Sequence, residues 1–414
     1  MRVFMLGWEY APIKSGGLGV ACRGITEGLN GEDVDVTFVM PAAFHGGGAE
    51  MDLERVKVVS RKLKHVKIFS PSHSLNNPYN REEILQSMPE VNFEKGKKSL
   101  YGADFFQEIE KFTAEAIALG KVHDHDVIHA HDWMTFEAAA QVKANSGKPF
   151  VAHVHATEID RTGGQPHDYI FEKEKRGLEQ ADHIIVVSFY TKKILEQFYG
   201  IPGDKISVVH NAAKVEVEDY DGKNLQMAKN PLAIKDKVVL FLGRVTLQKG
   251  PEYFVEMAKK VLEKRNGVKF IIAGTGDMMP KIVHLIAESG LSDKILLTGY
   301  LTGEPLNRAL YHADLYVMPS VSEPFGISAL EAVEFGTPVL ISKTSGAREV
   351  IHNSLRAEFW DIEKMANQAI AILDYPVLGK TLVEESQKET KFLTWKQQAK
   401  KIREVYQSLI LQHA

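Results

Sequence analysis

The chain has 414 residues, of which 44% are hydrophobic, and its formal net charge at pH 7 is −4. This length favours two or three domains, the charge gives no basic field for nucleic acid, and no apolar run is long enough to predict a membrane span. A single cysteine, Cys22, excludes an internal disulfide framework, and Met1–Leu6 is too short for the core of a secretion signal. We therefore expect a protein of the reducing cytoplasm.

The first predicted unit is a strand, a glycine-rich loop and a helix. The apolar run Arg2–Leu6 predicts the strand, the loop is Lys14–Gly19, and apolar residues recur at helical spacing from Leu18 to Leu29. Such a unit can hold phosphate on its backbone amides, although this loop does not match the dinucleotide-binding fingerprint. A further strand is expected over Asp33–Val39.

Residues 51–69 alternate basic and apolar side chains. We favour a hairpin with one solvated face, and the alternative is a surface for an anionic acceptor or a membrane. Residues 70–98 are polar and irregular, so we expect them to form an excursion of the first domain.

Four histidines lie close together at His123, His125, His129 and His131, which raises the question of a zinc site. We reject that site because Val127, Ile128 and Ala130 indicate a buried strand whose alternate residues face opposite ways. A second buried strand is expected over Phe150–His155, where we interpret His153 as a packing residue.

The rest of the chain alternates short apolar runs with helical patterns. After strands at His183–Val187 and Ile206–Val209, residues 212–236 are charged and aperiodic, which predicts a linker. Helices are expected over 345–353, 361–374 and Thr394–Leu411. Alternating strands and helices imply parallel sheets covered on both faces, with ligands at the carboxyl ends of the strands. The strands expected in this second half are Val238–Leu242, Phe270–Ala273, Ile295–Thr298, Leu315–Met318 and Val339–Ile341.

Two cations follow the first strand of the second half. Arg244 and Lys249 belong to the loop Gly243–Gly250, and Pro251 then stands at the natural first position of a helix. They are either ordinary surface cations or ligands of an anion. An arginine can bind a diphosphate with two hydrogen bonds, and a lysine adds a point charge.

Two glutamates frame the next loop. Glu323 follows the strand Leu315–Met318, and Glu331 comes eight positions later. The spacing of Ser328 and Glu331 predicts a capping box, with a helix that begins near Ser328 and offers free amides to an anion. Taken alone, each glutamate has a structural explanation, as a helix cap or a solvated loop residue.

The pattern of two glutamates separated by seven residues resembles that of retaining glycosyltransferases of the GT-B fold, especially glycogen and starch synthases and their group 1 relatives. The resemblance extends over nearly the whole chain. It implies two Rossmann-like, doubly wound parallel-sheet domains with a cleft between them. The expected parts are an acceptor domain over 1–211, a linker over 212–236, a donor domain over 237–392, and a helix over 393–414 that crosses back to the first domain.

The resemblance also implies roles for individual residues. Glu323 and His155 would contact the donor sugar, Arg244 and Lys249 would hold the diphosphate, and Glu331 would bind the ribose. Ala212 and Lys214 depart from the family's Asn-Gly-(Val/Ile)-Asp motif, of which Asn211 is kept. The remaining donor-binding residues implied by the family are Lys14, Gly16, Gly17, Asn211, Gly274, Tyr300, Phe325, Gly326, Ile327 and Ser328.

The implied activity is transfer of a sugar, expected to be glucose, from a nucleotide sugar of the ADP-glucose or UDP-glucose type to an α-glucan. The absence of an Asp-x-Asp motif near these elements predicts that no metal or other cofactor is required. The alternatives are a sugar-phosphate or lipid-linked acceptor, an epimerase or hydrolase of the same fold, and a non-catalytic carbohydrate-binding protein. We expect no nucleic-acid partner and no stable membrane insertion, and the sequence leaves the oligomeric state open.

Overall fold

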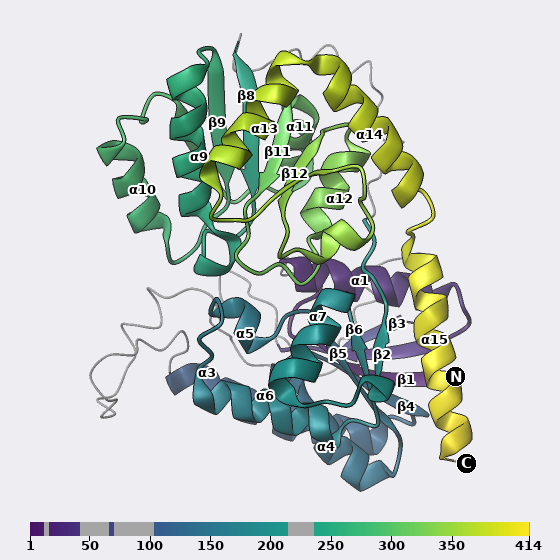
Figure 1. The fold of residues 1–414 in the computed structure, drawn as a ribbon. Coiled ribbons are helices and arrows are strands. Elements are labelled where there is room, and N and C mark those ends of the chain that lie inside the picture. The colour runs from purple at the N-terminus through teal and green to yellow at the C-terminus, as the bar shows by residue number, and fades with distance from the viewer. Residues whose placement is uncertain (12–15, 42–65, 70–102, 214–235, 414) are drawn as a thin grey trace. The chain divides into compact units, whose positions relative to one another are not determined.

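The computed structural model describes residues 1–11, 16–41, 66–69, 103–213 and 236–413 (Figure 1). Their contacts divide the chain into two compact units. Unit 1 comprises Met1–Ile159, Gly164–Ala212 and Thr394–Ala414, and unit 2 comprises Asp160–Gly163 and Ala213–Leu393. Within the described residues, no helix has the length and apolar character needed to span a membrane.

Unit 1 is built on a parallel sheet of seven strands in the order β3-β2-β1-β4-β5-β6-β7. The chain therefore reverses its direction of winding between β1 and β4, as in a Rossmann fold, and ligands of such folds bind at the carboxyl ends beside this point. The strands are β1 (Arg2–Leu6), β2 (Asp35–Val39), β3 (Val66–Phe69), β4 (Val127–His131), β5 (Phe150–Val154), β6 (His183–Val186) and β7 (Ile206–Val208).

Helices cover both faces of this sheet because its strands are apolar on both sides. Phe4, Ile128 and Ala152 pack with α3, α4 and α6 in one core. On the opposite face α1 packs against α15, and a Cβ atom on Gly24 would lie 2.2 Å from Trp395, so only glycine permits this approach. The helices are α1 (Gly17–Asn30), α3 (Ala103–Val122), α4 (Trp133–Ser146), α6 (Asp168–Gln180), α7 (Phe189–Ile194) and α15 (Trp395–Gln412). The short helix α5 (Glu158–Arg161) begins in unit 1 and ends in the segment Asp160–Gly163, which belongs to unit 2.

Unit 2 repeats the same winding in a parallel sheet of six strands, ordered β10-β9-β8-β11-β12-β13. Its reversal lies between β8 and β11. The strands are β8 (Lys237–Leu242), β9 (Val268–Ala273), β10 (Ile295–Gly299), β11 (Leu315–Met318), β12 (Val339–Ser342) and β13 (Leu355–Ala357). The helices are α9 (Pro251–Lys264), α10 (Met279–Glu288), α11 (Gly303–His312), α12 (Ile327–Glu334), α13 (Ile362–Asp374) and α14 (Pro376–Thr390).

Most expected elements are present, and the two Rossmann-like domains are confirmed. The helix expected over 345–353 is wrong: it is a single 3-10 turn at Gly346–Glu349, followed by strand β13. Of residues 51–69, only 66–69 are described, and they form a strand parallel to β2. The expected features over 70–98 and most of the linker lie outside the described residues, as does Lys14.

Candidate active site

The loops after β8 and β11 meet at the carboxyl edge of the unit 2 sheet, at its reversal point. Gly250 ends the first loop in the left-handed conformation, with φ of 62°. A Cβ atom there would lie 2.3 Å from the carbonyl oxygen of Pro319 in the second loop, so glycine is needed for this close approach. The approach brings Lys249, at the end of a 3-10 turn, to the loop that contains Glu323.

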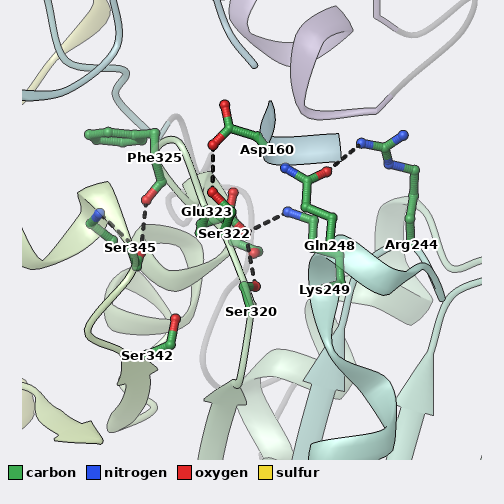
Figure 2. A network of polar contacts seen from close by, with 12 residues as sticks. Asp160, Arg244, Gln248, Lys249, Ser320, Ser322, Glu323, Phe325, Ser342 and Ser345 are labelled. Atoms are coloured by element: carbon green, nitrogen blue, oxygen red, sulfur yellow. Dashed lines mark hydrogen bonds and ion pairs between the residues drawn. The ribbon is translucent and has the colours of Figure 1, made fainter. Parts of the chain in front are cut away.

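Glu323 is held by its side chain, whose contacts Figure 2 shows, and by its backbone. Lys249 Nζ donates to Glu323 Oε2 at 2.5 Å, and Ser320 Oγ donates to the same oxygen at 3.2 Å. The backbone N–H of Glu323 donates to the Thr344 carbonyl, and its own carbonyl accepts from the N–H of Gly346, both at 2.9 Å. Because Glu323 is only 5% exposed, the paired lysine offsets the cost of burying its charge.

The second predicted cation occupies a different position from the first. Arg244 Nη2 donates to Gln248 Oε1 at 3.5 Å, so Arg244 contacts Gln248 whereas Lys249 is directed at Glu323 (Figure 2). Gln248 is buried, and its backbone carbonyl accepts a hydrogen bond from the N–H of Val321 at 2.9 Å. This bond connects the two loops. Two half-buried cations therefore stand in one loop, next to the N-terminus of α9. This arrangement suits a group with two phosphates.

The capping box predicted at Ser328 and Glu331 is wrong. Helix α12 begins at Ile327 after Gly326, which takes the N-cap position with φ of 99° and offers no side chain. Ser328 is thus already the second helical residue, and its hydroxyl shares a 2.8 Å hydrogen bond with the Tyr316 hydroxyl. Glu331 is half-buried, and burial raises the pKa of its carboxyl to about 7.

The other expected donor residues of unit 2 lie on the same edge. Gly274 follows β9 with φ of 152°, and a Cβ atom there would be 1.8 Å from the Gly243 carbonyl, so the contact that requires glycine is with the chain itself. Tyr300 follows β10 and is 58% exposed, whereas Phe325 and the first residue of α12, Ile327, are buried. Residues after β8, β9, β10 and β11 are therefore collected along one edge.

In unit 1, His155 follows β5 and is half-buried. Its backbone N–H donates to Asp132 Oδ1 at 2.7 Å, and its Nε2 lies 2.8 Å from His131 Nδ1. Asp132 directly follows β4 with φ of 60°, and it was not predicted as a site residue. Its position at the carboxyl end of a buried strand could have indicated it. Asn211 is buried after β7.

Of the glycine loop the structure describes Gly16–Gly19, and one of the amides expected to hold phosphate already has a partner. The N–H of Gly16 donates to Glu9 Oε2 at 3.1 Å, so a buried carboxylate occupies the amide that phosphate was expected to use. Gly17 is the first residue of α1, and a Cβ atom there would have no neighbour among the described residues within 4 Å. Glu9 was another residue that sequence reasoning missed.

The histidines of β4 and β5 lie together, so the prediction that strand geometry separates them is wrong. Residues two apart on a strand face the same side, so His129 and His131 both project toward one face of β4, and His153 of the adjacent β5 joins them. These three side chains are buried, and one ring nitrogen of each lies within 4.8 Å of those of the others. Burial lowers the pKa of all three, that of His129 to about 3, so the rings are neutral.

Comparison with known proteins places this geometry in context. Residues 222–389 match the family model described as glycosyl transferases group 1, and residues 15–217 match the model described as glycosyltransferase family 4. The chain is 32% identical to an uncharacterised glycosyltransferase of Methanocaldococcus jannaschii over 367 residues, covering 86% of this chain and 84% of the relative.

Two further proteins match over almost their full length. Glycogen synthase of Mycobacterium tuberculosis is 23% identical over 420 residues, covering 98% of this chain and 94% of that protein. The structure of sucrose-phosphate synthase from Thermosynechococcus elongatus superposes with a TM-score of 0.76 and 18% identity, covering 99% of both chains. The structural likeness shows that the chain shares the fold of that synthase.

Proposed function

Because the chain belongs to the group 1 glycosyltransferases, which take their sugar from a nucleotide sugar, we propose that it transfers glucose to an α-glucan with retained anomeric configuration. The observation that supports a catalytic role best is the Lys249–Glu323 pair at the carboxyl edge of unit 2. The match to a glycogen synthase over 94% of that protein's length supports the glucan acceptor.

The leaving group of this reaction is a nucleoside diphosphate, so negative charge develops on phosphate oxygens. Arg244, Lys249 and the amides at the start of α9 would stabilise that charge. Lys249 has three donors, so it can keep its bond to Glu323 while it contacts a phosphate. With two cations in place, the proposed chemistry requires no metal ion.

Glu323 would act on the sugar. Both side-chain contacts described for its carboxylate fall on Oε2, so Oε1 is the oxygen we assign to the donor sugar. Positive charge develops at the anomeric carbon as the diphosphate leaves, and a fixed carboxylate stabilises it more in the transition state than in the ground state. His155 would contact the same sugar. A departing phosphate oxygen would take the acceptor proton on the same face, which retains the configuration.

Glu331 would bind the ribose. With a pKa of about 7, its carboxyl exists near neutrality in both protonation states, and each state can hydrogen-bond to a ribose hydroxyl. This role does not depend on the capping box, since Ser328 bonds to Tyr316 instead.

A donor panel tests the proposal. Purified protein is incubated with ADP-, UDP- and GDP-sugars, with and without glycogen, and release of the nucleoside diphosphate is measured. The proposal expects release that depends on both a glucose donor and the glucan, with an α-linked product by NMR. A product of inverted configuration would exclude the retaining mechanism.

A phosphorylated sugar is the second candidate acceptor. It is favoured by the fold match to a sucrose-phosphate synthase, whose name specifies a sugar-phosphate product. The same panel with glucose 6-phosphate or fructose 6-phosphate in place of glycogen separates the two. If diphosphate is released only with a sugar phosphate, that sugar phosphate is the acceptor and the glucan is not.

The cytoplasmic location of the protein stays a prediction.

A further inference from the structure

Four imidazole rings form a stack in unit 1, on the sheet face that α15 covers. His129 and His131 are on β4, His153 is on β5, and His155 follows β5. The ring centroids of His129 and His131 are 4.4 Å apart, and those of His131 and His153 are 5.2 Å apart. Parallel pairing of His131 with His153 produces this arrangement, because paired residues present their side chains on the same face.

Hydrogen bonds join the four rings in two pairs. His129 Nε2 lies 3.1 Å from His153 Nδ1, His131 Nδ1 lies 2.8 Å from His155 Nε2, and His129 Nδ1 bonds to the Tyr406 hydroxyl of α15. Nε2 of His131 and Nε2 of His153 are buried and have no hydrogen-bond partner among the described residues. A buried polar atom without a partner is costly, so two of them in one cluster indicate a ligand.

We propose that His129, His131 and His153 bind a divalent transition-metal ion, with Nε2 of His131 and Nε2 of His153 as two of its ligands. Neutral imidazole is a common ligand of Zn²⁺, and structural zinc sites are closed to solvent, as this buried position is. One ring nitrogen of each of the three histidines lies within 4.8 Å of those of the others. A tetrahedral ion with Zn–N bonds of about 2.0–2.1 Å needs nitrogens about 3.3 Å apart, so the rings have to draw together.

The hydrogen-bond pattern fits metal binding in one further respect. A histidine that binds metal through one ring nitrogen generally donates the other N–H to a fixed acceptor, which orients the ring. His131 has such a partner in His155 Nε2, and His153 has one in His129 Nε2. His129 would complete the site by giving up one of its two hydrogen bonds. A metal on His131 Nε2 would also keep the proton of His131 on Nδ1 and so make it a donor to His155.

Zinc titration of the metal-free full chain tests the site. After dialysis against a chelator, we expect the protein to bind one equivalent of Zn²⁺ and to melt at a higher temperature when zinc is present, because the ion binds the folded state. His131→Asn and His153→Asn should each weaken binding by roughly 10-fold or more, since loss even of a supporting contact costs about 10- to 100-fold. The matched control is His183→Asn, which removes a half-buried histidine bonded to Ser207 and should leave binding unchanged.

Cobalt substitution keeps the test decisive if the asparagine variants fold poorly. Co²⁺ bound to the unmodified protein should show the intense visible ligand-field bands of a four-coordinate site. A spectrum typical of hydrated Co²⁺ would overturn the proposal, and so would failure to bind an equivalent of Zn²⁺. Equal zinc binding by the folded His131→Asn, His153→Asn and His183→Asn variants would also overturn it, because the ion would then be adventitious and the histidine stack a packing feature only.

Discussion

Lys249 Nζ lies 2.5 Å from Glu323 Oε2, and this ion pair joins two loops that leave neighbouring strands of the unit 2 sheet. The Glu323 side chain is 6% exposed and that of Lys249 is 20% exposed, so neither charge is fully hydrated. Removal of one partner from such a pair leaves an uncompensated charge, which costs far more than the pair itself contributes. A variant of either residue should therefore lose stability mainly because the charge of the other residue stays buried without a partner.

Lys249→Ala should weaken binding of the nucleoside diphosphate. The lost contact to phosphate is charge-assisted, so the binding free energy should become weaker by about 1.5–3 kcal/mol. Calorimetry measures this as a rise in the dissociation constant. The variant should also lower the free energy of unfolding, because Glu323 stays buried without its cation. Glu323→Gln added to Lys249→Ala should restore most of that stability without restoring nucleotide affinity.

The matched control for this experiment is Lys281→Ala, which removes an exposed lysine of α10. It should change neither nucleotide affinity nor stability appreciably, since exposed ion pairs contribute about 0–1 kcal/mol. Nucleotide affinity of Lys249→Ala equal to that of the control would remove Lys249 from the donor site.

Ser320→Ala tests whether the second contact to Glu323 positions its carboxylate. The buried hydroxyl donates to the same oxygen as Lys249, so its loss should let the carboxylate turn and should lower kcat roughly 5- to 10-fold, or about 1 kcal/mol. Nucleotide affinity should stay the same. Ser354→Ala, which removes a half-buried hydroxyl bonded to a backbone carbonyl, is the control. An unchanged kcat in Ser320→Ala would show that Lys249 and the backbone hold Glu323 in position without help from Ser320.

The sequence predicted the sheets and the sheet edge of the candidate site, because a polar loop after an apolar strand marks the carboxyl end of that strand. It also named Arg244, Lys249 and Glu323. It did not predict which of the two cations contacts Glu323, since that depends on the close approach of Gly250 to Pro319, a tertiary contact with no local pattern.

Local patterns also failed where the backbone took an unusual conformation. The Ser328–Glu331 spacing is a valid cap signal, but a left-handed Gly326 begins α12 one residue earlier and turns Ser328 toward Tyr316. The histidine cluster was rejected for another reason: the strand was expected to turn its histidines to opposite faces, whereas His129 and His131, two apart, share one face. Pairing of β4 with β5 then adds His153 to that face, which one strand alone does not show.

Glu331→Gln should change stability in a manner that depends on pH. Because burial raises the folded-state pKa of Glu331 from 4.5 to about 7, the folded protein binds a proton more tightly than the unfolded chain does. The stabilisation that this proton provides is complete below about pH 4.5 and is lost as the pH rises through 7. The glutamine variant should therefore match the original at pH 4.5 and exceed its free energy of unfolding by about 1–3 kcal/mol at pH 8.

Urea unfolding at the two pH values measures this difference. Glu404→Gln, at an exposed position on α15, should show no change between them and serves as the control. If Glu331→Gln is no more stable than the original protein at pH 8, Glu331 is hydrated rather than buried in solution.

The last prediction separates the two glutamates by the step that each affects. Glu331→Ala should raise the dissociation constant of free nucleotide, because the ribose contact exists in the ground state. It should not destabilise α12 through a lost cap, since no side chain caps that helix. Glu323→Ala should leave free-nucleotide affinity nearly intact and lower turnover strongly, because its interaction with the sugar strengthens only in the transition state.

Lys249 should affect the nucleotide affinity of the Glu323→Ala variant. Without Glu323, its amino group loses a 2.5 Å partner and becomes available to phosphate alone, so nucleotide affinity should rise slightly rather than fall. Calorimetry gives the affinity, and diphosphate release gives the turnover. Loss of nucleotide binding in Glu323→Ala together with loss of turnover alone in Glu331→Ala would reverse the assigned roles. Unchanged affinity and turnover in both variants would mean that this stretch of unit 2 is structural and that the chemistry takes place on other residues.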